Sequence, residues 1–201
     1  MNWLKVKSIL VASLVACSLY AQQNQGYWEY ITQYEEIAVS EMYRSGIPAS
    51  ITLAQGLLES GAGKSQLAIR SNNHFGIKCH NGWQGDRVYH DDDAKDECFR
   101  KYDSVEESYE DHAEFLDQSP RYDSLFAYSS SDYRSWARGL KAAGYATAPD
   151  YAQRLTRIIE ENLLFLFDED KDYLNPIPTN ERVLTNGAIT QNPGWNDGLT
   201  F

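Results

Sequence analysis

The sequence predicts an α+β fold in which a mainly helical body carries a small inserted β-lobe, with a cleft where the two meet. Apolar residues recur at helical spacing over 27–71 and again over 104–167. Between these segments, 75–102 contains three short runs typical of strands, separated by turns rich in Gly, Asn and Asp. The 201 residues suffice for one compact domain plus tails, and no internal repeat is present.

The first two predicted helices lie before the β-lobe. One spans 27–46 and is ended by its final glycine, and the next begins with Pro48, which is favoured in a first helical turn. Gly61 and Gly63 end this second helix, and Glu59 in its last turn is its single carboxylate. Helical spacing places on the buried faces Trp28, Ile31, Tyr34, Ile37, Ala38, Ile51, Ala54, Leu57 and Leu58.

The β-lobe is predicted from the segments "FGIKC", "DRVYH" and "ECFRKY", at 75–79, 86–90 and 97–102. A short helix over 65–71 and a turn over 72–76 lead into it. The lobe is therefore expected to be a small sheet inserted between helices.

Three helices are predicted after the β-lobe. Ser104 and Glu107 form a capping box for a helix that continues to 118. A second helix covers 132–143 and ends before a glycine, and a long helix with a strong apolar stripe covers 149–167.

The two ends of the chain are predicted to lie outside the folded domain, which is expected to span 27–168. Residues 1–21 resemble a signal peptide, with two lysines followed by an apolar run too short for a comfortable membrane span. Cleavage near Ala21 competes with lipidation at Cys17, because "LVAC" resembles a bacterial lipobox. Both alternatives predict export. The polar, Pro-, Gly- and Asn-rich segment 169–201 predicts a flexible tail.

Composition and charge narrow the function classes. The net charge of −11 argues against nucleic acid and anionic membranes as partners, while 14 Tyr and 5 Trp supply aromatic faces that can grip sugars. The four histidines lack metal-ligand spacing, so turn, surface or groove positions are expected, and no metal or cofactor is predicted. Cys79 and Cys98 are an even pair in an exported chain and predict a disulfide closing a loop of roughly 20 residues.

Glu59 is the candidate that carries chemistry. Its carboxylate faces the negative end of the helix dipole, and Leu57 and Leu58 place apolar surface beside it. Both effects disfavour the ionised form and are expected to raise the pKa of Glu59. A carboxyl group that stays protonated near neutral pH is what glycosidic bond cleavage needs as a general acid.

Four segments follow one another in the chain: "AQGLLESGAGKSQLA", "NNHFGIK", "FRKYDS" and "GYATAPDYAQRL". Together they resemble the glucosaminidase domain of glycoside hydrolase family 73, which includes bacterial autolysins and the peptidoglycan-cleaving domain of the flagellar rod protein. The resemblance covers roughly 31–167. It implies a lysozyme-like fold that hydrolyses the bond after N-acetylglucosamine in peptidoglycan, with Glu59 as the general acid.

The resemblance also implies further site residues. Tyr145 of "GYAT" resembles the residue proposed to line the site near the reacting sugar, although an aromatic core position is the alternative. Substrate contacts are expected from Asn73, Phe75, Thr147 and Tyr151. Ala148 stands where many members carry an aspartate, so this position cannot supply a catalytic base.

A second carboxylate is expected from the acidic turn of the β-lobe, across the cleft from Glu59. A solvated acidic face is the simpler interpretation of this turn. Asp91 is favoured because it lies at the strand end, and the candidates are Asp91, Asp92, Asp93 and Glu97. A base at this position that activates water inverts the anomeric configuration, whereas attack by the 2-acetamido group of the substrate retains it. The first route is preferred, and the sequence leaves both open.

The predicted function is an endo-acting N-acetylglucosaminidase that acts on peptidoglycan glycan strands. The protein is expected to be exported to the periplasm, cell envelope or medium and to be a monomer. Three alternatives remain: a muramidase or lytic transglycosylase on the same fold, an endoglycosidase for N-linked glycans, and a catalytically inactive glycan-binding envelope protein.

Overall fold

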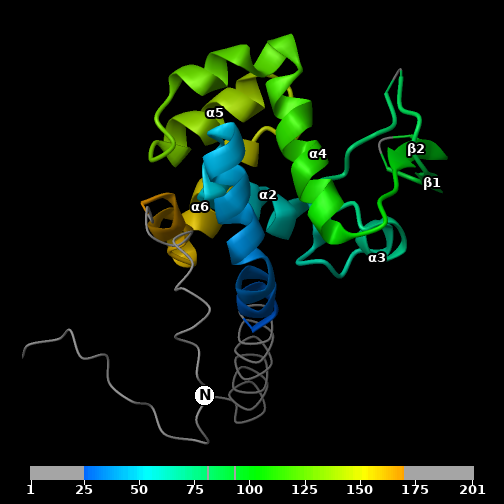
Figure 1. The fold of residues 1–201 in the computed structure, drawn as a ribbon, viewed down its shortest axis with the longest axis horizontal. Coiled ribbons are helices and arrows are strands. Elements are labelled where there is room, and N and C mark those ends of the chain that lie inside the picture. The colour runs from blue at the N-terminus through cyan, green and yellow to red at the C-terminus, as the bar shows by residue number, and fades with distance from the viewer. Residues whose placement is uncertain (1–24, 81, 93, 170–201) are drawn as a thin grey trace, which may run out of the picture. The chain divides into compact units, whose positions relative to one another are not determined.

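The computed structural model describes residues 25–80, 82–92 and 94–169, so the predicted signal segment with Cys17 and nearly all of the predicted tail lie outside the described residues. Helices dominate, and a two-stranded antiparallel sheet is inserted among them, which confirms the predicted α+β class (Figure 1). In chain order, the elements are an N-terminal helix described over 25–45, α2 (Ala49–Ser60), α3 (Gln66–Ser71), β1 (Arg87–His90), β2 (Glu97–Arg100), α4 (Val105–Asp117), η1 (Pro120–Ala127), α5 (Tyr133–Ala142), α6 (Tyr151–Glu161) and η2 (Leu164–Asp168). No helix in the described ranges is long and apolar enough to cross a membrane.

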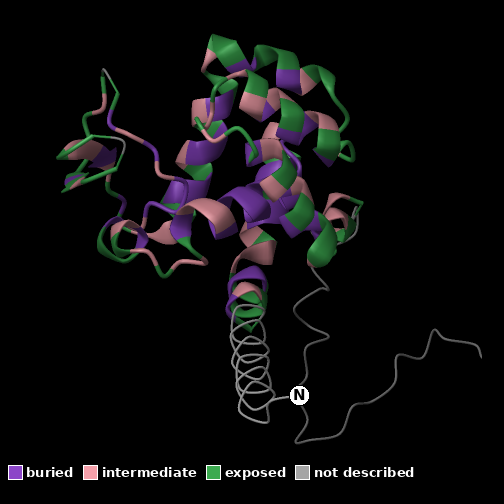
Figure 2. Cartoon of the chain, turned by 180° about the vertical axis from the view of Figure 1, so that it is seen from behind, coloured by how far each residue is buried: buried purple, intermediate pink, exposed green. Residues whose placement is uncertain are grey.

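Helix α2 lies at the centre of the helical body. It packs against α5, α6 and η2, and nearly all of its residues are buried (Figure 2). Asp168 fixes the start of α2, because its carboxylate accepts hydrogen bonds from the backbone N–H and the hydroxyl of Ser50, at 2.8 and 2.6 Å. A side chain carried by this helix is therefore held on a rigid support.

The N-terminal helix packs through most of the predicted face, since Ile31 and Ala38 are buried, but Trp28 is not part of it. Trp28 is 68% exposed, so its predicted burial is wrong, whereas Tyr30 is 3% exposed. The hydroxyl of Tyr30 lies 3.0 Å from His74 Nδ1 and 2.9 Å from the Tyr109 hydroxyl, and it sits over Gly56 of α2, where a Cβ would collide with it. This buried polar cluster anchors the helix at Tyr30.

The β-lobe consists of one hairpin. Strands β1 and β2 pair in antiparallel register, with Val88 opposite Phe99. The predicted strand over 75–79 contributes only an isolated bridge at Lys78. Gly76 turns the backbone into the left-handed region, at φ 63°, and this interrupts an extended strand.

The Cys79–Cys98 disulfide is present, which confirms the predicted pairing, and its Cα atoms lie 5.4 Å apart. The Cys79 N–H also donates to the Cys98 carbonyl, at 2.9 Å. The bridge thus ties the segment that enters the β-lobe to β2.

Replacement of both cysteines by serine is expected to lower the free energy of unfolding by about 3 kcal/mol, because the unfolded chain regains the entropy of an open loop. Chemical denaturation with and without reductant measures this effect. Reductant should destabilise the wild type and leave the double variant unchanged. Equal stability of the oxidised and reduced wild-type protein would contradict the prediction.

The C-terminal helices confirm the predicted order but not every boundary. Helix α5 agrees with its predicted range, whereas the predicted long helix over 149–167 is divided into α6 and η2. Leu163, between them, has a left-handed backbone at φ 55°, which ends the α-helix. The η1 segment, rich in polar residues, carried no helical pattern in the sequence.

Candidate active site

A cleft of about 510 Å³ separates the helical body from the β-lobe, at the place predicted from the sequence. Helix α2 contributes Glu59, α6 contributes Tyr151 and Arg154, and the β-lobe contributes Lys78 and Asp92. The loop over 144–148 completes the wall between α5 and α6. Charged groups from three separate parts of the chain therefore converge on one space.

Glu59 occupies the last turn of α2. The helix ends one residue later, and Gly61 caps it in the left-handed conformation, at φ 58°. The Gly61 N–H donates to the Leu57 carbonyl, so the helix end is closed by the backbone itself. Half-buried Glu59 is thereby directed into the cleft from the end of the most buried helix.

The pKa of Glu59 is raised above its ordinary value. Burial is the largest cause, and the negative charge of Asp92 adds to it. A hydrogen bond from Tyr151 and the positive charge of Arg154 act in the opposite direction and are outweighed. The carboxyl group therefore keeps its proton to higher pH than an exposed glutamate does, as a general acid requires.

A chain of hydrogen bonds runs from Glu59 into the core. The Tyr151 hydroxyl donates to Glu59 Oε1 at 2.9 Å, and it accepts from Gln55 Nε2 at 3.0 Å. Gln55 Oε1 lies 3.1 Å from His112 Nε2. Since an amide oxygen only accepts, His112 must donate from Nε2, and every bond in this chain then points toward Glu59. In the described part of the protein no hydrogen bond reaches Glu59 Oε2, which leaves this oxygen to carry the proton.

His112 is fully buried, so its expected turn, surface or groove position is wrong. Burial lowers the pKa of His112 to about 3, and the ring is neutral at physiological pH. The Phe75 ring stacks on it, with centroids 4.0 Å apart. Among the residues that the structure describes, His112 Nδ1 has no hydrogen-bond partner, as expected of the unprotonated nitrogen in a tautomer that donates from Nε2.

Tyr151→Phe is expected to move the basic limb of the pH–kcat profile to higher pH. The lost hydrogen bond favoured the ionised carboxylate of Glu59, so its removal raises the pKa further and keeps the acid protonated to higher pH. Hydrolysis rates measured across the pH range test this. Tyr145→Phe is the matched control, because Tyr145 donates to the Phe75 carbonyl and not to Glu59. A basic limb that stays in place in Tyr151→Phe would refute the assignment.

The acidic turn of the β-lobe places one described carboxylate in the cleft. Asp92 lines it, and Lys78 Nζ lies 3.5 Å from Asp92 Oδ2 and 2.9 Å from Glu97 Oε1. Asp91, the favoured candidate, does not line the cleft, and its Oδ1 accepts from the Asp96 N–H at 2.8 Å, within the turn. Asp93 lies outside the described residues.

The other predicted contacts divide into two groups. Phe75, Tyr145 and Thr147 line the cleft together with Tyr151, and the Tyr145 and Tyr151 rings stack with centroids 5.9 Å apart. Asn73 does not line the cleft: it is buried, and its amide group bonds the backbone of Ile77 and Arg100. Asn73 thus anchors the β-lobe in this structure.

Residues at this site that were not anticipated from the sequence include Gln55, His112 and Arg154. Gln55 precedes Glu59 by four positions and therefore shares its helix face, which is a usable signal. His112 and Arg154 are indicated only weakly, as polar residues on otherwise apolar helix faces. Their roles depend on contacts between distant segments.

The sequence matches the glucosaminidase family, described as mannosyl-glycoprotein endo-beta-N-acetylglucosaminidase, over residues 35–164. The chain belongs to this family. Among curated relatives, "Peptidoglycan hydrolase FlgJ" of Vibrio cholerae is 34% identical over 64% of this chain and 42% of its own length. "Exo-glucosaminidase LytG" of Bacillus subtilis is 32% identical over 67% of this chain and 51% of its own. The chain thus spans about half the length of these relatives, or less.

Solved structures of the same family share the fold. A peptidoglycan hydrolase from Sphingomonas sp. A1 has a TM-score of 0.61 and 35% identity, and the match covers 69% of this chain and 91% of that one. The glycoside hydrolase domain of Salmonella typhimurium FlgJ has a TM-score of 0.56 and 28% identity, covering 73% and 94%. These findings confirm both the predicted family and the lysozyme-like architecture.

Proposed function

We propose that this chain is an endo-acting N-acetylglucosaminidase of peptidoglycan, with Glu59 as the general acid. The observation that carries the proposal is Glu59 itself, a carboxyl group of raised pKa that lines the cleft with one oxygen held by Tyr151. Family membership and relatives named peptidoglycan hydrolases support the choice of polymer.

In the proposed reaction, Glu59 donates its proton to the oxygen of the leaving sugar. Asp92, which lines the cleft from the β-lobe, activates the attacking water, and Lys78 Nζ lies 3.5 Å from its carboxylate. We prefer Asp92 to Asp91 because the Asp91 side chain is used inside the turn. Tyr145, stacked on Tyr151, lines the wall near the reacting sugar.

Digestion of purified peptidoglycan followed by reducing-end analysis tests the function. We expect N-acetylglucosamine at the new reducing end and a rapid fall in strand length, as endo cleavage produces. N-acetylmuramic acid or its anhydro form at the new end would identify a muramidase or transglycosylase instead. Cleavage of N-linked glycans in preference to peptidoglycan, or no cleavage at all, would also refute the proposal.

We propose that the enzyme works outside the cytoplasm, at the cell envelope, as a monomer. The relatives named peptidoglycan hydrolase and autolysin support an envelope location. Export through a signal peptide cleaved near Ala21, or a lipid anchor at Cys17, is part of this proposal. Intact mass of protein isolated from its native cells separates the two fates.

A further inference from the structure

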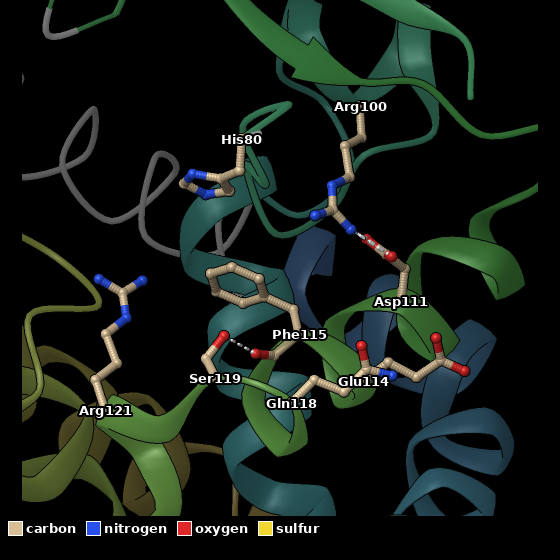
Figure 3. Close-up of a pocket in the computed structure, with 8 residues that line it drawn as sticks. All are labelled: His80, Arg100, Asp111, Glu114, Phe115, Gln118, Ser119 and Arg121. Carbon is tan, nitrogen blue, oxygen red and sulfur yellow. Dashed lines mark hydrogen bonds and ion pairs between the residues drawn. The ribbon is translucent and has the colours of Figure 1, made fainter. Parts of the chain in front are cut away.

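A second cavity, of about 400 Å³, opens beside the cleft against the end of α4 and the start of η1 (Figure 3). It shares His80, Phe115 and Arg121 with the cleft, so the two form neighbouring parts of one groove. A polymer bound in the cleft can therefore extend a substituent into this cavity.

One arginine of the cavity is already neutralised and the other is not. Arg100 Nη1 donates to both carboxylate oxygens of Asp111, at 2.6 and 2.8 Å. The Arg121 guanidinium lies over aromatic rings, 4.6 Å from the centroid of Tyr122 and 5.7 Å from that of Phe115. Within the described residues no carboxylate lies at ion-pair distance from Arg121. Its charge is thus held in place by stacking and available to a ligand.

The surroundings of His80 report a local positive potential. The pKa of His80 is lowered first by burial and then by the charges of Arg100, Arg121 and Lys78. Figure 3 shows the Arg121 guanidinium on the His80 side of the Phe115 ring and Glu114 on the other side. Although the chain as a whole has a net charge of −11, this point of the groove favours an anion.

The polymer named in the proposed function determines which anion is available. The linked sugars of peptidoglycan are uncharged once the lactyl group is joined to the peptide as an amide. The carboxylates of the repeating unit therefore belong to the short peptide on alternate sugars. A planar guanidinium on an aromatic support suits a carboxylate, which it can bind through two parallel hydrogen bonds.

We infer that this second cavity binds a carboxylate of the peptide substituent of peptidoglycan, with Arg121 as the recognising side chain and Phe115 as its support. The inference rests on the proposed function and extends it to substrate selection. The enzyme would then favour strands that carry peptides over bare glycan.

The test compares kcat/KM on three substrates: peptide-bearing strands, the same strands with amidated carboxylates, and strands stripped of peptide. Arg121→Gln is expected to lower the ratio of peptide-bearing to peptide-free activity about tenfold, the scale of one lost charge-assisted hydrogen bond. Amidation of the carboxylates should lower the same ratio of the wild-type enzyme by the same factor. It should cause no further loss in Arg121→Gln. Arg157→Gln, an exposed arginine of α6 that lines neither cavity nor cleft, is the matched control.

The inference would be overturned if Arg121→Gln left the ratio unchanged. It would also be overturned if Arg121→Gln lowered activity on amidated strands as much as on unmodified peptide-bearing strands. Binding of the Glu59→Gln variant to peptide-bearing strands, with and without Arg121→Gln, separates it from the proposed function. If the wild type cleaves no glycan but binding to peptide-bearing strands still depends on Arg121, the proposed function is refuted and the peptide site in the cavity is retained. If the wild type cleaves peptidoglycan without any preference for peptide-bearing strands, the proposed function is retained and the peptide site is refuted.

Discussion

Glu59→Gln is expected to reduce hydrolysis of purified peptidoglycan at least about a hundredfold, the usual contribution of a general acid. Glutamine keeps the shape of the side chain, and its Oε1 can still accept the Tyr151 hydroxyl hydrogen. It has no proton to give to the leaving oxygen, so the step that needs the acid is slowed. Release of reducing ends from purified walls measures the loss.

Folding should be unharmed in this variant. Burial raises the pKa of Glu59 in the folded protein, so ionisation of this group above its unfolded pKa costs folding free energy. The neutral amide removes that cost, and stability at neutral pH should be equal or higher. Glu161→Gln, at an exposed position at the end of α6, is the control for glutamate loss in general. Activity near the wild-type level in Glu59→Gln would eliminate the assignment.

Local sequence signals predicted the position of Glu59 because each acts over a few residues. Pro48, which the structure places at the N-cap, an apolar stripe and a glycine fix the start, the buried face and the end of α2 without reference to other segments. The position of Glu59 follows from these boundaries. It lies two residues after buried Leu57 and two before Gly61, so it falls in the last turn at the edge of the buried face. The disulfide was predicted from an even pair of cysteines in a chain expected to be exported.

The errors arise where tertiary contacts decide. Apolar spacing favoured Trp28 for the core, but Trp28 is exposed and Tyr30 is buried instead, with its hydroxyl bonded to His74 and Tyr109. No local pattern could indicate this, because the three residues come from distant segments. The chain from His112 through Gln55 to Tyr151 was missed for the same reason.

The choice between Asp91 and Asp92 shows that side-chain direction within a turn could not be predicted from the sequence. The two residues are adjacent, and their carboxylates have identical chemistry. The bond from the Asp96 N–H directs Asp91 into the turn, while Asp92 faces Lys78 and the cleft. Side-chain direction in a tight turn follows backbone geometry, which composition does not specify.

Asp92→Asn is expected to lower kcat about a hundredfold, because the amide cannot take a proton from the attacking water. Asp91→Asn is the matched control: the neighbouring residue bears the same chemistry but lies outside the cleft lining, and its variant should retain most of its activity. Both kcat values are measured on the same wall preparation. The Asp92 side chain is partly exposed, so its replacement should leave the fold intact.

The anomeric configuration of the first product then decides how Asp92 acts. In inverting glycosidases the two carboxyl groups stand about 6.5–9.5 Å apart, which leaves room for a water molecule between acid and base. With Glu59 on α2 and Asp92 on the facing β-lobe, we expect inversion, observed by NMR as the α-anomer at the new reducing end before mutarotation. A retained β-anomer together with full activity in Asp92→Asn would show that the 2-acetamido group of the substrate attacks instead. Glu59 would remain the acid in that case, and Tyr145 would be the residue placed to orient the acetamido group.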